Sequence, residues 1–228
     1  MNAVQFIGIF FAIFIPMVII IDPLSTLALF ISMTSDRSRR EQVLTARDAI
    51  VYASAFLVLF VIAGKYILEY MGISIDALKV TGGILLAIFG LNMLKEGEHV
   101  EAPKVKEIAM EHLVAEAAHN GELPTGGKVP RGGDIALVPL AIPLLAGPGA
   151  ISYCIVVMGD YHVFWYLVLL AIAVTMAITF TLLVNAPRIL KYVGPNGARA
   201  LTRIMGFLTM ALAIDYAMDG IFSWVHSF

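Results

Sequence analysis

The chain has 228 residues, of which 60% are hydrophobic and 14% are charged, with a formal net charge of −2 and a mean hydropathy of +0.88. A soluble domain needs a polar surface, so this composition excludes one and indicates an integral membrane protein. The slightly acidic balance indicates no nucleic-acid partner, which would require a basic face. The single cysteine, Cys154, excludes an intrachain disulfide.

Six apolar stretches are long enough to cross a bilayer, because about 20 helical residues span about 30 Å of hydrocarbon. In chain order they cover residues 3–34, 45–66, 77–94, 135–158, 163–186 and 201–226. The sequence therefore predicts an all-α integral membrane protein with six transmembrane helices. They form one membrane domain from two three-helix parts, residues 1–95 and 135–228, joined by a polar loop over residues 96–134.

The first stretch, residues 3–34, is too long for one straight transmembrane helix. It would extend about 48 Å at 1.5 Å per residue, against about 30 Å of hydrocarbon. Its sole charged residue, Asp22, precedes Pro23, and proline breaks a helix but is favoured at the first position of a new one. Aspartate is a preferred N-cap that accepts hydrogen bonds from amides, here those around Ser25 and Thr26. We expect the helix to break at Asp22 and Pro23, near the midplane.

The third stretch aligns with the sixth when the sequence is shifted by 123 residues. This shift matches Gly83 with Gly206 and Asn92 with Asp215. Because each half has three spans, the second half must have the opposite orientation in the membrane. We therefore expect two inverted-topology three-helix repeats, with two unrelated helical halves as the alternative.

The fourth stretch contains VPLAIPLLAGPGAIS, in which Pro148 stands between Gly147 and Gly149. Shifting Pro23 by 123 residues gives Ala146, two residues from Pro148, so the two prolines occupy nearly the same place in their repeats. We expect this fourth helix to break near the midplane as well, with Gly147 as the cap and Pro148 in the first helical position.

Two half-helix N-termini would then meet inside the membrane. Such ends expose free amides and partial positive charge, and they favour a carboxylate. Glycines would let a small ligand approach the backbone, and hydroxyls would orient it. The carboxylate of the first break would pair with an ammonium group or exchange a proton, with simple helix capping as the alternative. The expected substrate-binding residues are Asp22, Pro23, Ser25, Thr26, Gly147, Pro148, Gly149 and Ser152.

The sixth stretch carries a second intramembrane acid, Asp215, about two-thirds of the way along it. An ionisable residue at such a depth is a functional hypothesis by default. The candidates for coupling to an ion gradient are therefore Asp22, Asp215 and Asn92. An interhelical hydrogen bond is the alternative role of Asn92. Asp219, one turn after Asp215, is expected at the outer interface.

Lysine and arginine are retained on the cytoplasmic side of short loops. Thirteen of the fifteen such residues lie in the first, central and fifth loops and their flanks, which leaves Lys65 and Lys79 on the other side. We therefore expect both termini outside the cytoplasm and the central loop inside it.

The sequence contains no phosphate loop, no HExxH or GxSxG motif, and no Cys or His cluster with metal-ligand spacing. We expect neither an enzyme nor a cofactor nor a bound metal. An intramembrane hydrolase that pairs Asp22 with Asp215 is the enzymatic alternative.

The strings DPLST, SMTSDRSRREQ and VPLAIPLLAGPGAIS, in six spans split by a polar loop, resemble the MarC family of bacterial and archaeal inner-membrane proteins. The resemblance implies two related three-helix halves in the inner membrane. By similarity to the archaeal member SnatA, it also implies ion-driven uptake of small neutral amino acids such as glycine and alanine. Relatives often have glycine and asparagine after the Asp-Pro pair, where this chain has hydroxyl residues.

The expected function is a secondary transporter of small neutral amino acids that works by alternating access around the paired breaks. Its partners would be a small polar solute, a proton or sodium ion, and the lipid bilayer. One alternative is an exporter of another small polar solute or of a metal ion, because carboxylates and hydroxyls also ligate hard cations. Another is a membrane scaffold without transport.

Overall fold

The computed structural model describes residues 2–96 and 145–226, and the regular structure in these two ranges is entirely helical. Five helices there are long and apolar enough to cross a membrane. The all-α membrane class predicted from composition is thereby confirmed. Residues 135–144 of the expected fourth span and residues 97–134 of the polar loop lie outside the described ranges.

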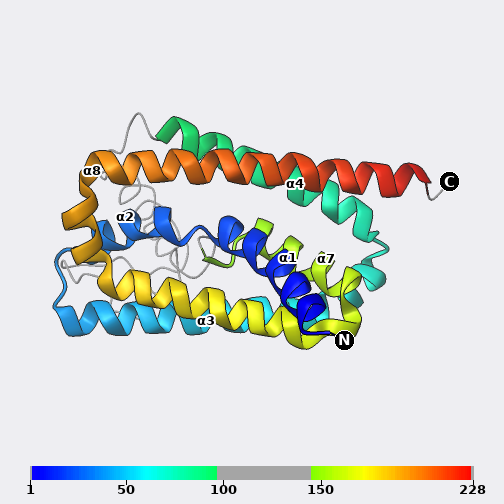
Figure 1. Cartoon of the computed structure of the whole chain (residues 1–228), viewed down its shortest axis with the longest axis horizontal. Coiled ribbons are helices and arrows are strands. Elements are labelled where there is room, and N and C mark those ends of the chain that lie inside the picture. Colours follow the sequence, from blue (N-terminus) through cyan, green and yellow to red (C-terminus); the bar gives the residue numbers. More distant parts are fainter. Residues whose placement is uncertain (1, 97–144, 227–228) are drawn as a thin grey trace, which may run out of the picture.

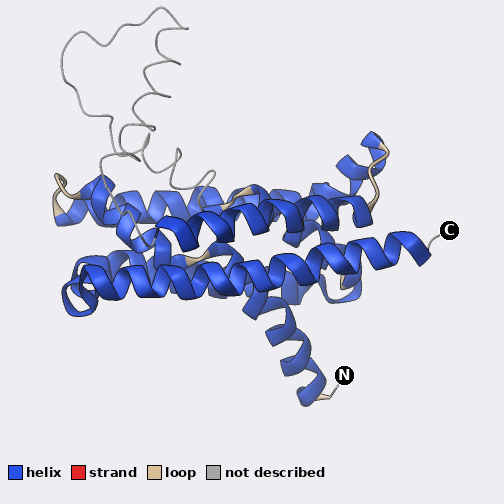
Figure 2. Ribbon diagram, turned by 90° about the horizontal axis from the view of Figure 1, so that it is seen from above, coloured by secondary structure: helices blue, strands red, loops and turns tan. Residues whose placement is uncertain are grey.

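The first predicted span is two helices, α1 (Ala3–Ile21) and α2 (Pro23–Thr34). The interruption falls at Asp22, the predicted residue, because Pro23 has no amide hydrogen to continue α1 and instead opens α2. The N-terminal part of α1 projects away from the other helices (Figure 2), and Val4 is accordingly 81% exposed.

The second predicted span, residues 45–66, is the longer helix α3 (Arg39–Met71). It begins with a capping box, in which Ser38 Oγ accepts from the amide of Glu41 at 3.4 Å and Glu41 Oε2 accepts from the amide of Ser38 at 2.8 Å. It ends at Gly72, whose φ of 68° allows a left-handed cap. The apolar stretch is shorter than α3, because both ends of the helix carry charged residues that still favour a helix.

The third predicted span is α4 (Ile75–Glu96). After the undescribed segment come α7 (Pro148–Asp160), a short 3-10 helix η2 (His162–Phe164) and α8 (Trp165–His226). The last of these joins the fifth and sixth predicted spans. Non-helical Gly194, with φ 69° and ψ 170°, divides α8 into a first arm, Trp165–Gly194, and a second arm, Asn196–His226.

The two arms of α8 lie on opposite sides of the broken segments (Figure 1). The first arm, in yellow, runs beside α3, and the second arm, in red, runs beside α4, while α1, α2 and α7 lie between them. This arrangement encloses the start of α2 and the start of α7 between helices from both parts of the chain.

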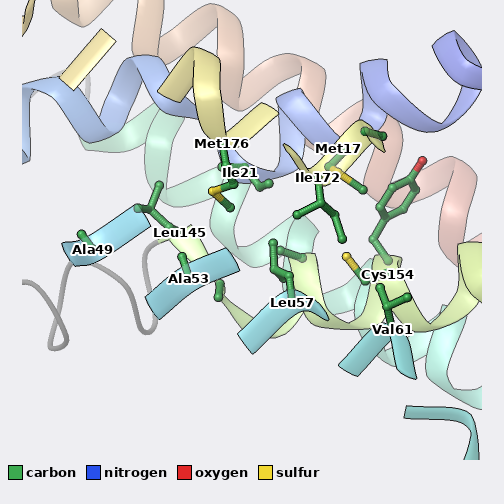
Figure 3. Packing of buried hydrophobic residues seen from close by; sticks show 14 of the residues in the cluster. Met17, Ile21, Ala49, Ala53, Leu57, Val61, Leu145, Cys154, Ile172 and Met176 are labelled. Atoms are coloured by element: carbon green, nitrogen blue, oxygen red, sulfur yellow. The ribbon is translucent and has the colours of Figure 1, made fainter. Parts of the chain in front are cut away.

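The core is continuous between these layers (Figure 3). Helix α3 contributes a narrow stripe at spacings of three and four residues, which includes Ala49, Ala53 and Leu57. Side chains of α7 and of the first arm of α8 pack on this stripe, and buried side chains of α1 belong to the same core. Tyr153 of α7 also donates a hydrogen bond from its hydroxyl to the carbonyl of Ile13 in α1, at 2.9 Å. The core therefore ties α7 to the first broken segment.

Candidate functional site

Asp22 joins α1 to α2 in a conformation that few non-glycine residues adopt. Its φ of 46° and ψ of 69° are left-handed, and it is the sole non-glycine residue with a positive φ in the described ranges. Aspartate visits this region more readily than most residues because its short polar side chain bonds to nearby backbone. Such a conformation costs about 1–3 kcal/mol and persists only where surrounding structure holds it.

Asp22 is buried, at 5% exposure, and only one of its two carboxylate oxygens has a hydrogen-bond partner among the described residues. Its Oδ1 accepts from the amide of Ser25 at 3.3 Å, which is the predicted N-cap bond. Its Oδ2 has no hydrogen-bond partner among the described residues. Buried polar atoms are nearly always paired, so an orphaned carboxylate oxygen marks a position where a ligand, an ion or water completes the set.

Helix α7 begins at Pro148, as predicted, and its cap is Gly147 in an extended conformation. The carbonyl of Gly147 accepts from the amide of Ile151 at 3.0 Å, while no side chain caps this end. The free amides of the first turn of α7 therefore give it the anion-attracting end expected of a helix N-terminus.

The starts of the two helices lie near one another. A methyl group placed on Gly149 would be 3.8 Å from Cγ2 of Ile20, which is two residues before Asp22. The same methyl group would overlap the side chain of Leu86 in α4. Leu86 thus covers Gly149, whereas the sequence predicted that this glycine gives a ligand open access to the backbone.

The predicted hydroxyl residues divide into two roles. Thr26 Oγ1 donates to the carbonyl of Asp22 at 2.9 Å, and this bond secures the turn. Ser25 Oγ lies 3.5 Å from Oγ1 of Thr202 in the second arm of α8. Ser152 is buried and packs against Gly82 of α4, away from the first turn of α7. Ser25 is therefore the hydroxyl nearest to the interruption that still faces another helix.

Two coupling candidates lie elsewhere. The sequence predicted Asp215 to be buried within the membrane, but it is exposed on the second arm of α8, and Asn92 is exposed on α4. The faces by which α4 and α8 pack against each other are formed by small residues instead. Both polar side chains therefore point outward. Their role in ion coupling stays a prediction.

Sequence reasoning missed an ion pair between the two parts of the chain. Lys79 Nζ in α4 lies 2.6 Å from Asp219 Oδ2 in α8, and the Lys79 side chain is 8% exposed. The signal was present, because Lys79 and Asp219 were both assigned to the outer end of their helices. What the sequence lacked was the register between α4 and α8.

Sequence reasoning also missed two hydroxyls. The Oγ1 atoms of Thr175 and Thr209, in the two arms of α8, are buried without a hydrogen-bond partner in the part of the chain that the structure describes. Other helical threonines here, such as Thr34 and Thr179, donate to the carbonyl four residues earlier. A threonine in an apolar helix carries no sequence signal for this difference.

The whole chain resembles known membrane proteins. A model described as MarC family integral membrane protein matches residues 7–225. A UPF0056 membrane protein of Methanocaldococcus jannaschii is 36% identical over 204 residues, which cover 89% of this chain and 90% of the relative. The UPF0056 membrane protein YhcE of Escherichia coli is 33% identical over 215 residues, or 93% and 92% of the two chains.

A further relative, the UPF0056 inner membrane protein MarC of Escherichia coli, is 29% identical over 216 residues, with 91% of each chain covered. No solved structure matches the chain.

Proposed function

The chain belongs to the MarC family of integral membrane proteins, and from this premise we propose that it is a secondary transporter of small neutral amino acids, of the glycine and alanine class. The proposed transport is coupled to a proton or sodium gradient across the inner membrane. The proposed solute site lies where α2 and α7 begin.

One observation carries the proposal. Asp22, in a segment apolar and long enough to cross a membrane, is 5% exposed and leaves Oδ2 without a partner among the described residues. An intramembrane acid is costly to retain and is generally placed where a substrate or ion passes. If Asp22 only capped α2, one carboxylate oxygen would be hydrogen-bonded to the helix, and the other would be in contact with water or with another partner. A solute that reaches this oxygen accounts for both the burial and the missing partner.

The two groups of a zwitterion suit this place. The free amides at the start of α7 favour the carboxylate. The unpartnered oxygen of Asp22 accepts hydrogen bonds, and an ammonium group donates three. Interrupted transmembrane helices bind carboxylate-bearing substrates in this manner in other transporter folds. The choice of glycine and alanine rests on the resemblance to SnatA.

The side chain of Leu86 lies directly over Gly149 and limits the room for a solute there. We expect Leu86→Ala to let valine compete with alanine uptake, with an apparent affinity for valine about tenfold higher than in the wild type. Competition by unlabelled valine measures this change. Leu85→Ala is the matched control, since Leu85 is 39% exposed on the same helix. Equal competition in both variants would contradict a role for Leu86 in size selection.

We also propose that the two parts of the chain are inverted repeats. Gly83 packs against Ala213 and Ala217, and Gly206 packs against Gly90 and Leu94. Adding 123 to the α4 residue and subtracting 123 from the α8 residues converts the first set of contacts into the second. Gly83 and Gly206, and likewise Ala213 and Gly90, thus occupy corresponding positions in the contact, which supports an internal two-fold axis in the membrane plane.

The proposed orientation has both termini outside the cytoplasm. Both termini lie at the same end of the helices as the turn between α3 and α4 (Figure 1). The opposite end holds the turn between α2 and α3 and the bend at Gly194, which are flanked by Arg37, Arg39, Arg40, Lys191 and Arg199. The positive-inside rule supports assigning that end to the cytoplasm.

Uptake into proteoliposomes tests the proposed function. The purified chain is reconstituted, and accumulation of labelled glycine and alanine is followed with an inward proton gradient, with an inward sodium gradient, and with neither. We expect saturable accumulation that depends on one of the two gradients. Vesicles preloaded with label are examined in parallel, because release without uptake would indicate an exporter. Absence of both uptake and release for these amino acids would overturn the proposal.

A further inference from the structure

Three residues of the second arm of α8 form a row along one helix face: Thr202, Thr209 and Tyr216. They are seven residues apart, and seven residues make almost two full turns of an α-helix, so successive members are displaced by only about 20°. Successive members are separated by about 10 Å along the axis. We call this set the 202–209–216 row.

The two ends of the row contact α2 and α7. At one end, Thr202 Oγ1 lies 3.5 Å from Oγ of Ser25, in the first turn of α2. At the other end, the hydroxyl of Tyr216 donates to the carbonyl of Ser152, in the second turn of α7, at 3.3 Å. The middle of the row therefore faces the region between the starts of α2 and α7.

Thr209 occupies this middle position. It is 2% exposed, and its Oγ1 has no hydrogen-bond partner among the residues that the structure describes. A threonine in a helix usually bonds to the carbonyl four residues earlier, as Thr202 does with Ala198 at 3.1 Å. Among the described residues, Thr209 therefore holds a buried hydroxyl that is free for a further group.

We propose that the Thr209 hydroxyl lines the solute site and hydrogen-bonds the transported solute, together with Oδ2 of Asp22. This inference rests on the proposed function and adds a residue to the site. Both atoms are acceptors, so together they suit the protonated amino group of a small solute. The Thr209 hydroxyl also donates, which leaves it able to bridge to the solute carboxylate.

The 123-residue shift gives the same position in α4 to Leu86, which lies over the start of α7. The two central positions therefore differ in chemistry: a hydroxyl on α8 and an apolar side chain on α4. In this arrangement Thr209 meets the charged groups of the solute, and Leu86 meets its side chain.

Cysteine labelling tests the location of Thr209 without a transport measurement. We expect the introduced thiol of Thr209→Cys to react with a small methanethiosulfonate reagent added from either side, and to react more slowly in the presence of alanine. The wild type is the negative control, because its one cysteine, Cys154, is 1% exposed. Thr179→Cys is the positional control on the first arm, where Thr179 is fully buried. A Thr209→Cys thiol as unreactive as these controls would overturn the inference.

Uptake kinetics test the contact. We expect Thr209→Val to raise the KM for alanine about tenfold, the effect of losing one hydrogen bond to a charged group. Its melting temperature should equal or exceed that of the wild type, because valine removes an unpaired buried hydroxyl and keeps the shape. Thr209→Ser should keep the wild-type KM. Thr179→Val removes a hydroxyl that is already bonded within its helix, and its KM should not change.

The outcomes separate the inference from the proposed function. A wild type that transports alanine, with an unchanged KM in Thr209→Val, would overturn the inference alone. A wild type that transports no small neutral amino acid would overturn the proposed function, and the labelling rates would then decide whether Thr209 faces a solute path.

Discussion

Replacing Asp22 with asparagine is expected to reduce the uptake of glycine and alanine by about tenfold to a hundredfold, the range for losing a hydrogen bond to a charged group. Asparagine tolerates the left-handed conformation that Asp22 adopts, and its amide oxygen still accepts from the amide of Ser25. What changes is the buried Oδ2, which is replaced by an amide nitrogen that donates and therefore repels an ammonium group. The fold should persist while the solute loses its acceptor.

Initial uptake rates and the thermal midpoint of the same purified sample measure the two effects together. Asp36→Asn is the matched control, because Asp36 is an exposed carboxylate in the turn between α2 and α3. We expect this control to transport at the wild-type rate. Uptake by Asp22→Asn at the wild-type rate would show that Asp22 only caps α2. The proposed site would then lose its main support.

Replacing Gly83 with alanine is expected to give the largest loss of stability among conservative changes in α4. Its new methyl group would lie 2.7 Å from both the carbonyl oxygen of Ala213 and Cβ of Ala217. The amide nitrogen of Ala217 would be 2.8 Å away. Backbone atoms have no rotamer by which to yield, so α4 and the second arm of α8 must separate. Overpacking of this kind costs about 1–3 kcal/mol, beyond the gain of up to about 1 kcal/mol from replacing glycine within a helix.

The midpoint of unfolding in detergent measures this loss. Gly8→Ala is the matched control, because a methyl group there has no atom within 4 Å and should leave stability equal or slightly higher. Gly206→Ala should resemble Gly83→Ala, since its methyl group would lie 2.9 Å from Cβ of Met93 and 3.0 Å from the carbonyl oxygen of Gly90. Equal stability of Gly83→Ala and Gly8→Ala would show that α4 and α8 do not approach as closely as the structure has them. If Gly83→Ala lost stability and Gly206→Ala did not, the result would count against the proposed repeat.

The interruption at Asp22 and the start of α7 could be predicted from the sequence, because both arise from local chemistry. Proline lacks the amide hydrogen, and aspartate caps the helix that follows, so α1 ends at Ile21 and α2 begins at Pro23. The same reasoning placed the start of α7 at Pro148. The ends of a helix were predicted less accurately where they do not coincide with the limits of the apolar sequence, as the additional turns of α3 show.

Composition and the apolar stretches determined by themselves that this is an all-helical membrane protein, and Pro23 and Pro148 with their preceding caps determined where two of its helices begin. Only the tertiary structure decided which faces meet: that Leu86 covers Gly149, that the Thr209 hydroxyl is buried without a partner among the described residues, that Lys79 pairs with Asp219, and that Asp215 is exposed. The reason is that lipid and protein core are both apolar. A helix between them needs no polar face, so its sequence carries little record of the side that packs against its neighbours.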